Sequence, residues 1–127
     1  MTQTSASGVD RLTPKVIPGE QLVRFGPRIA ENAARFADKP CVIDETETVT
    51  WAEFGDRVAR LAGRLKAMGV GPGSMVMSLA ENSAANLIMY AGVLYAGACM
   101  VPQPFSATEP ALVKMRSDCG GTLLFTT

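Results

Sequence analysis

The apolar residues of this chain fall into short blocks, and the spacing within the blocks switches between that of a helix and that of a strand. Residues 1–20 show little apolar periodicity and contain two prolines, which is typical of a polar arm or disordered tail. From Pro27 onward, Ile29, Ala33 and Phe36 recur at helical spacing. This pattern predicts a short helix with the proline in its first turn, where the missing N–H would be unpaired anyway.

Two apolar runs of strand length follow, at residues 41–43 and 49–51. They flank an acidic turn at residues 44–47. The pattern predicts a short N-terminal β-hairpin, and we expect the charges of its turn to face solvent.

The clearest local signal begins at Thr50, because Glu53 stands three residues later and completes a capping box. In this motif the hydroxyl accepts a backbone N–H of the first turn, and the carboxylate accepts the N–H of the cap. Gly69 supplies the left-handed residue that ends such a helix, and Val70 packs back against the last turn. Between these ends runs one apolar stripe, at spacings of three and four: Phe54, Val58, Leu61, Leu65 and Met68.

Strand and helix patterns alternate through the rest of the chain. We expect strands at residues 75–79, 98–101 and 122–125, and helices at residues 84–95 and 108–120. The first of these helices is apolar almost all round, which predicts burial on most sides. The order predicts an α/β fold over residues 21–127, with a mostly parallel sheet, helices on both faces and a short N-terminal hairpin.

Composition and charge narrow the range of partners. Apolar residues make up 47% of the 127-residue chain and charged residues 19%, which supports a packed core. Lys plus Arg and Asp plus Glu each number 12, so there is no basic excess to neutralise nucleic-acid phosphates. Histidine, the commonest general base near neutral pH, is absent from the sequence. We therefore expect no nucleic-acid partner and no histidine-dependent hydrolysis.

The three cysteines, Cys41, Cys99 and Cys119, lack the C-x-x-C spacing of a redox or metal-binding pair. We interpret them as reduced core residues, which indicates a cytoplasmic protein. The uncharged run at residues 87–101 is too short to span a membrane as a helix, and Gly97 interrupts it.

A glycine cluster at residues 71–73 is the first candidate for chemistry, because glycine-rich loops cradle phosphates at the start of a helix. This cluster instead follows a helix and enters a strand, and it has no Lys. We interpret it as a turn.

In open α/β sheets, ligands gather beyond the carboxyl ends of the strands, which here are residues 81–83 and 103–108. Asn82 or Ser83 is explained as the cap of the next helix, and Glu81 has no identified catalytic partner. We predict that this chain contains no catalytic, cofactor-binding or metal-binding residue.

Three segments from Thr48 onward read TVTWAEFGDRVARLAGRLKAMGVGPG, MVMSLAENSAANLIMYAGVLYAGACMVPQ and MRSDCGGTLLFTT. In this order they resemble the N-terminal part of the adenylate-forming superfamily, which contains acyl- and aryl-CoA synthetases, amino-acid adenylation domains and luciferases. The counterparts of the family motifs are Thr50-Trp51-Ala52-Glu53-Phe54, Gly69-Val70-Gly71-Pro72-Gly73-Ser74, Asn82-Ser83, Ala96-Gly97-Ala98 and Val101-Pro102. The shared pattern extends from about Arg28 to Thr127.

The resemblance implies the front part of an ATP-dependent carboxylic acid:CoA ligase. The parent enzyme would use ATP, Mg²⁺ and CoA, and its substrate would be a small carboxylic acid. In similar enzymes the phosphate loop with its Lys, the Asp that holds the ATP ribose and the catalytic Lys all come later in the chain. Residues 103–106 replace a common Leu-Asn-Pro-Arg, so a basic contact to a CoA phosphate is missing here. The resemblance therefore implies a truncated scaffold that is inactive alone and binds no cofactor.

Two alternatives stay open. In the first, the parent protein belongs to the same superfamily but is an amino-acid adenylation domain. In the second, the chain is a free-standing small α/β binding module without catalysis, because a fold does not fix a function. If the chain is truncated, apolar faces meant for the missing part are exposed, and we expect the isolated chain to self-associate.

Overall fold

The computed structural model describes residues 24–127, so the arm predicted at residues 1–20 lies outside the described residues. In chain order the elements are α2 (Phe25–Arg35), β1 (Pro40–Ile43), β2 (Thr48–Thr50), α3 (Trp51–Ala67), β3 (Met75–Leu79), α4 (Ala84–Tyr95), β4 (Cys99–Pro102), α5 (Glu109–Cys119) and β5 (Leu123–Thr126). The helix predicted from Pro27 begins two residues earlier, and the proline stays in its first turn.

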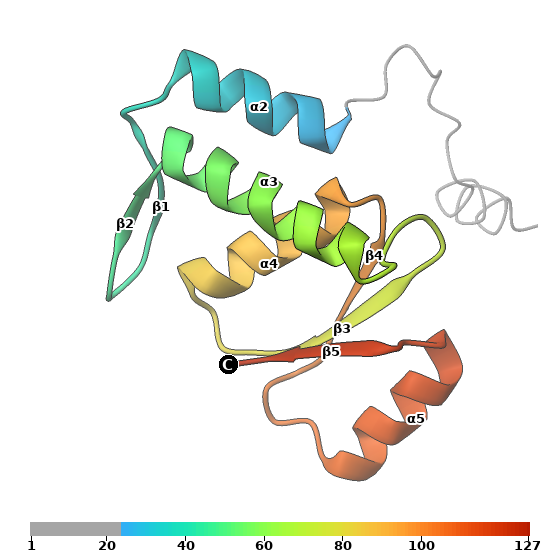
Figure 1. Ribbon diagram of the computed structural model, residues 1–127. Helices are drawn as coiled ribbons and strands as arrows, with labels where there is room; N and C mark the ends of the chain where they lie inside the picture. The colour runs from blue at the N-terminus through green and yellow to red at the C-terminus, as the bar shows by residue number, and fades with distance from the viewer. Residues whose placement is uncertain (1–23) are drawn as a thin grey trace, which may run out of the picture.

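Three strands form a parallel sheet in the order β4-β3-β5, because β4 and β5 both pair with the central β3. The strands β1 and β2 form a separate antiparallel hairpin. Helices α3 and α4 lie on one face of the three-stranded sheet, and α5 lies on the other (Figure 1). The α/β class predicted from the sequence is confirmed, including the parallel sheet and the hairpin.

Both ends of α3 form as their sequence signals predict. At the start, the Thr50 N–H donates to the Glu53 carboxylate over 2.8 Å, and the Glu53 N–H donates to the Thr50 hydroxyl over 3.3 Å. At the end, Gly69 adopts a φ of 86°. The Val70 N–H then donates to the Leu65 carbonyl over 2.9 Å, which satisfies a carbonyl of the last turn.

The apolar stripe of α3 is buried at Phe54, Val58 and Leu65, as predicted. The prediction for Met68 is wrong, because its side chain is 65% exposed. Met68 is the cap that follows the last helical residue, so its side chain no longer follows the stripe. Ala62, one turn before Leu65, is buried although the predicted stripe does not include it.

Helix α4 was predicted to be buried on most sides, and this is only partly correct. Ala84, Ile88 and Val93 are buried, whereas Leu87 is 48% and Tyr90 is 37% exposed. The sheet and α3 cover two sides of the helix (Figure 1). Leu87 and Tyr90 line a hollow of about 490 Å³ between α4 and the β1–β2 hairpin, so this apolar face stays partly open.

The buried side chains form two clusters that meet at α3 and α4. One cluster joins the C-terminal halves of these helices to the sheet through residues such as Leu65 and Val76. The other joins their N-terminal halves to α2 and the hairpin through residues such as Ile29 and Val49. Leu61 and Tyr95 contact both clusters, so the two clusters are packed as one continuous core.

All three cysteines are free thiols, as predicted. Cys41 and Cys119 are partly buried, and burial raises the pKa of the Cys41 thiol. The prediction that Cys99 is a core residue is wrong, because it is exposed. Cys99 begins β4, which lies at the edge of the sheet, and alternation along the strand turns Met100 inward instead.

No helix within residues 24–127 is long and apolar enough to cross a membrane, which agrees with the reading of residues 87–101.

Helices α3 and α4 approach each other closely at Gly92. A Cβ atom added there would lie 2.7 Å from the Leu61 Cδ2 atom and 2.9 Å from its Cγ atom. Both distances are below normal carbon–carbon contact, so only glycine allows this packing without movement of Leu61. In contrast, a Cβ atom added at Gly63 on α3 would meet nothing within 4 Å.

We therefore predict opposite effects for the same substitution at these two helical glycines. Gly92→Ala lowers the free energy of unfolding by about 1–3 kcal/mol, because overpacking outweighs the gain in helix propensity. Gly63→Ala raises it by about 0.5–1 kcal/mol, because the added methyl group only restricts the unfolded chain. Urea denaturation of the two variants measures both values, and stabilisation by both substitutions contradicts the close approach.

Candidate functional site

A hollow of about 890 Å³ lies at the carboxyl edge of the parallel sheet. All three strands run in the same direction, so the loops that follow them meet at this edge, where α/β proteins bind ligands. The turn of the β1–β2 hairpin forms a further wall. The lining residues are Asp44, Glu45, Thr46, Ala80, Glu81, Asn82, Ser83, Gln103, Pro104, Phe105 and Thr127. Both loops that the sequence indicated as contact loops therefore reach one hollow.

The loop after β3 serves mainly to start α4. The Ser83 hydroxyl accepts the Asn86 N–H over 3.1 Å, so Ser83, one of the two predicted residues, is the cap. The Glu81 N–H donates to the Thr127 hydroxyl over 3.2 Å, which ties this loop to the end of β5. The Glu81 carboxylate is exposed and forms no ion pair or hydrogen bond among residues 24–127.

The loop after β4 folds back on its own strand. The Gln103 N–H donates to the Ser78 carbonyl over 2.7 Å, and its side-chain amide donates to the Pro102 carbonyl over 3.1 Å. Phe105 stands 56% exposed at the hollow. The loop thus presents an aromatic ring and backbone carbonyls, and no basic side chain.

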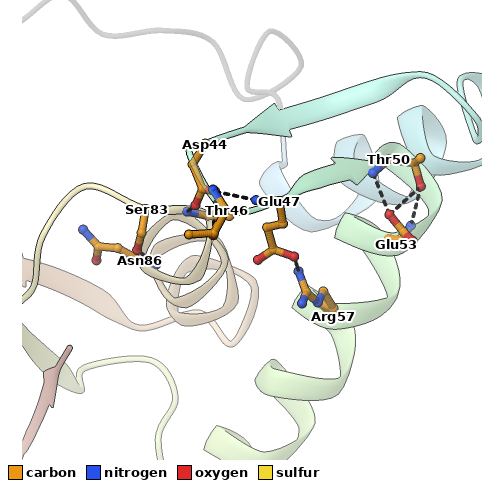
Figure 2. Close-up of polar contacts among 9 residues, drawn as sticks. Asp44, Thr46, Glu47, Thr50, Glu53, Arg57, Ser83 and Asn86 are labelled. Atoms are coloured by element: carbon orange, nitrogen blue, oxygen red, sulfur yellow. Dashed lines mark hydrogen bonds and ion pairs between the residues drawn. The ribbon is translucent and has the colours of Figure 1, made fainter.

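Asp44 is the residue at this site that the sequence analysis missed. Its Oδ1 atom accepts the N–H groups of Thr46 and Glu47 and the Thr46 hydroxyl, each over 2.8 Å. Its Oδ2 atom accepts the Ala84 N–H, also over 2.8 Å. One carboxylate therefore holds the hairpin turn in shape and joins it to the first residue of α4, 40 positions later (Figure 2).

We predicted that the charges of the hairpin turn face solvent, and this is wrong for two of its three carboxylates. Asp44 is engaged as described, and Glu47 forms an ion pair of 3.0 Å with Arg57 on α3 (Figure 2). Only Glu45 fits the prediction, since it is exposed. An Asp followed by Thr two positions later is a known turn signal, but it carries no information about a partner 40 residues away.

Hydrogen bonding controls the acidity of two carboxylates near the hairpin. Hydrogen bonds from backbone N–H groups hold the pKa of Asp44 well below its ordinary range. The bond from Ala84 has the largest effect, and those from Thr46 and Glu47 come next. The Thr50 N–H similarly lowers the pKa of Glu53. The positive end of the α4 helix dipole acts in the same direction on Asp44. Both groups are therefore ionised at neutral pH and stabilise the fold in that form.

The electrostatic character of the hollow opposes nucleotide phosphates. Its lining holds the carboxylates of Asp44, Glu45 and Glu81 and includes neither Lys nor Arg. Residues 24–127 contain no group of three or more His, Cys, Asp or Glu side chains that could hold a metal ion. The turn at residues 71–73 connects α3 to β3, so it offers no helix start for a phosphate. The residues that line this hollow do not fit ATP–Mg²⁺.

Comparison with protein families decides the relationship. Residues 29–127 match the model of the family described as AMP-binding enzyme. The chain belongs to the AMP-binding enzyme family. This match agrees with the resemblance to adenylate-forming enzymes that the sequence motifs indicate. It covers all of the parallel sheet and the helices that pack on it.

Relatives in the AMP-binding family include both CoA ligases and peptide synthetases. A feruloyl-CoA synthase from Amycolatopsis is 40% identical over 79 residues, which span 62% of this chain and 16% of that protein. Surfactin synthase subunit 1 from Bacillus subtilis is 32% identical over 96 residues, which span 76% of this chain and 3% of that protein. The chain thus corresponds to a small part of each of these relatives.

Solved structures show the same fold. A benzoate CoA ligase from Burkholderia xenovorans superimposes with a TM-score of 0.75 at 25% identity, covering 81% of this chain and 21% of that one. A fused adenylation–PCP protein from Klebsiella oxytoca superimposes with a TM-score of 0.77 at 24% identity, covering 84% and 20%. The second likeness shows the fold alone.

The bond between Asp44 and Ala84 leads to a prediction about pH. The pKa of Asp44 is lower in the folded chain than in the unfolded chain, where it is about 3.9. The stabilisation is therefore complete above about pH 4 and is lost as the pH falls toward the folded value. We predict that Asp44→Asn is less stable than the wild type at pH 7, because an amide NH₂ group cannot accept an N–H. The difference shrinks at pH 3.

Urea denaturation at both pH values measures this effect, with Glu45→Gln as the matched control. Glu45 is the neighbouring carboxylate and forms no hydrogen bond among residues 24–127, so its variant should follow the wild type. The Ala84 amide should also exchange with solvent faster in Asp44→Asn. An unchanged stability difference between pH 7 and pH 3 contradicts the role of the Asp44 carboxylate.

Proposed function

We propose that the chain is the N-terminal structural portion of an AMP-forming carboxylic acid:CoA ligase. The parent enzyme joins a carboxylic acid to ATP, releasing pyrophosphate and forming an acyl-adenylate. The thiol of CoA then attacks the acyl carbon, and AMP leaves. The observation that carries this proposal is the AMP-binding family match over residues 29–127, together with 40% identity to a feruloyl-CoA synthase.

The part of this chain in that reaction is structural. Its hollow at the sheet edge carries three carboxylates and no cation, so it repels the phosphates that adenylation must bind. The described residues instead fix loop positions. Asp44 holds the hairpin to α4, Ser83 starts that helix, and Gln103 anchors the loop after β4. We propose that catalytic groups elsewhere in the parent enzyme are built against this frame, and that residues 1–127 alone are inactive.

The alternative within the family is an amino-acid adenylation domain, and the 32% identity to surfactin synthase subunit 1 favours it. The two functions share the adenylation step and differ in the thiol that accepts the acyl group. The identity of the acid, whether fatty, aromatic or amino, depends on residues outside this segment. A cytoplasmic location and self-association of the isolated chain remain predictions.

Pyrophosphate release from a panel of fatty, aromatic and amino acids tests the proposal. We predict release by the full-length gene product and none by residues 1–127, because no Lys or Arg lines the hollow at the sheet edge. Formation of a CoA thioester by the full-length product then separates the ligase from the adenylation domain.

Three results contradict different parts of this proposal. Pyrophosphate release by residues 1–127 overturns the structural role of the segment. A full-length product that activates no acid in the panel overturns adenylation, and a reading frame that stops after Thr127 favours a free-standing binding module.

A further inference from the structure

We draw no further inference here: the strongest candidate, the hollow of about 490 Å³ between α4 and the β1–β2 hairpin, carries none, because nothing among residues 24–127 shows what covers it.

Discussion

The close contact between α3 and α4 at Gly92 and Leu61 is the constraint on which the rest of this structure depends. A single methyl group at Gly92 would stand 2.7 Å from a Leu61 methyl carbon, so the two helices are as near as their side chains allow. Helix α3 makes a similar approach to α2, where a Cβ atom at Gly55 would lie 2.7 Å from the Ala33 Cβ atom. Because Leu61 packs against both core clusters, its helix joins the sheet on one side to the hairpin and α2 on the other.

This contact determines the position of the hollow at the sheet edge. Packing against α3 fixes α4, and the first residue of α4 is bonded to Asp44 in the hairpin turn. The hairpin in turn leads without a break into α3 through the capping box at Thr50, and Glu47 pairs with Arg57 on the same helix. These links close a ring of covalent and noncovalent connections. The walls of the hollow are consequently held by the core.

Local signals in the sequence predicted local structure well. The capping box, the glycine that ends α3 and the serine that starts α4 each depend on residues within a few positions of one another, and each forms as expected. The errors concern burial and distant partners. Cys99 is exposed because of its place at a sheet edge. Leu87 and Tyr90 are exposed because they line a hollow beside the hairpin, and Asp44 bonds a residue 40 positions away. Spacing along a chain does not encode which elements become neighbours, so no pattern could indicate these features.

The chain belongs to the AMP-binding enzyme family. The central claim about its structure is that α3 and α4 hold the walls of the hollow together as one unit. Amide hydrogen exchange of the wild type and of Gly92→Ala tests it most directly. If the account is right, the substitution lowers protection in the β1–β2 hairpin and at Ala84 as much as it does within α4. If protection falls in α4 alone and the hairpin keeps its wild-type exchange rates, the two helices do not organise the hollow, and the account is wrong.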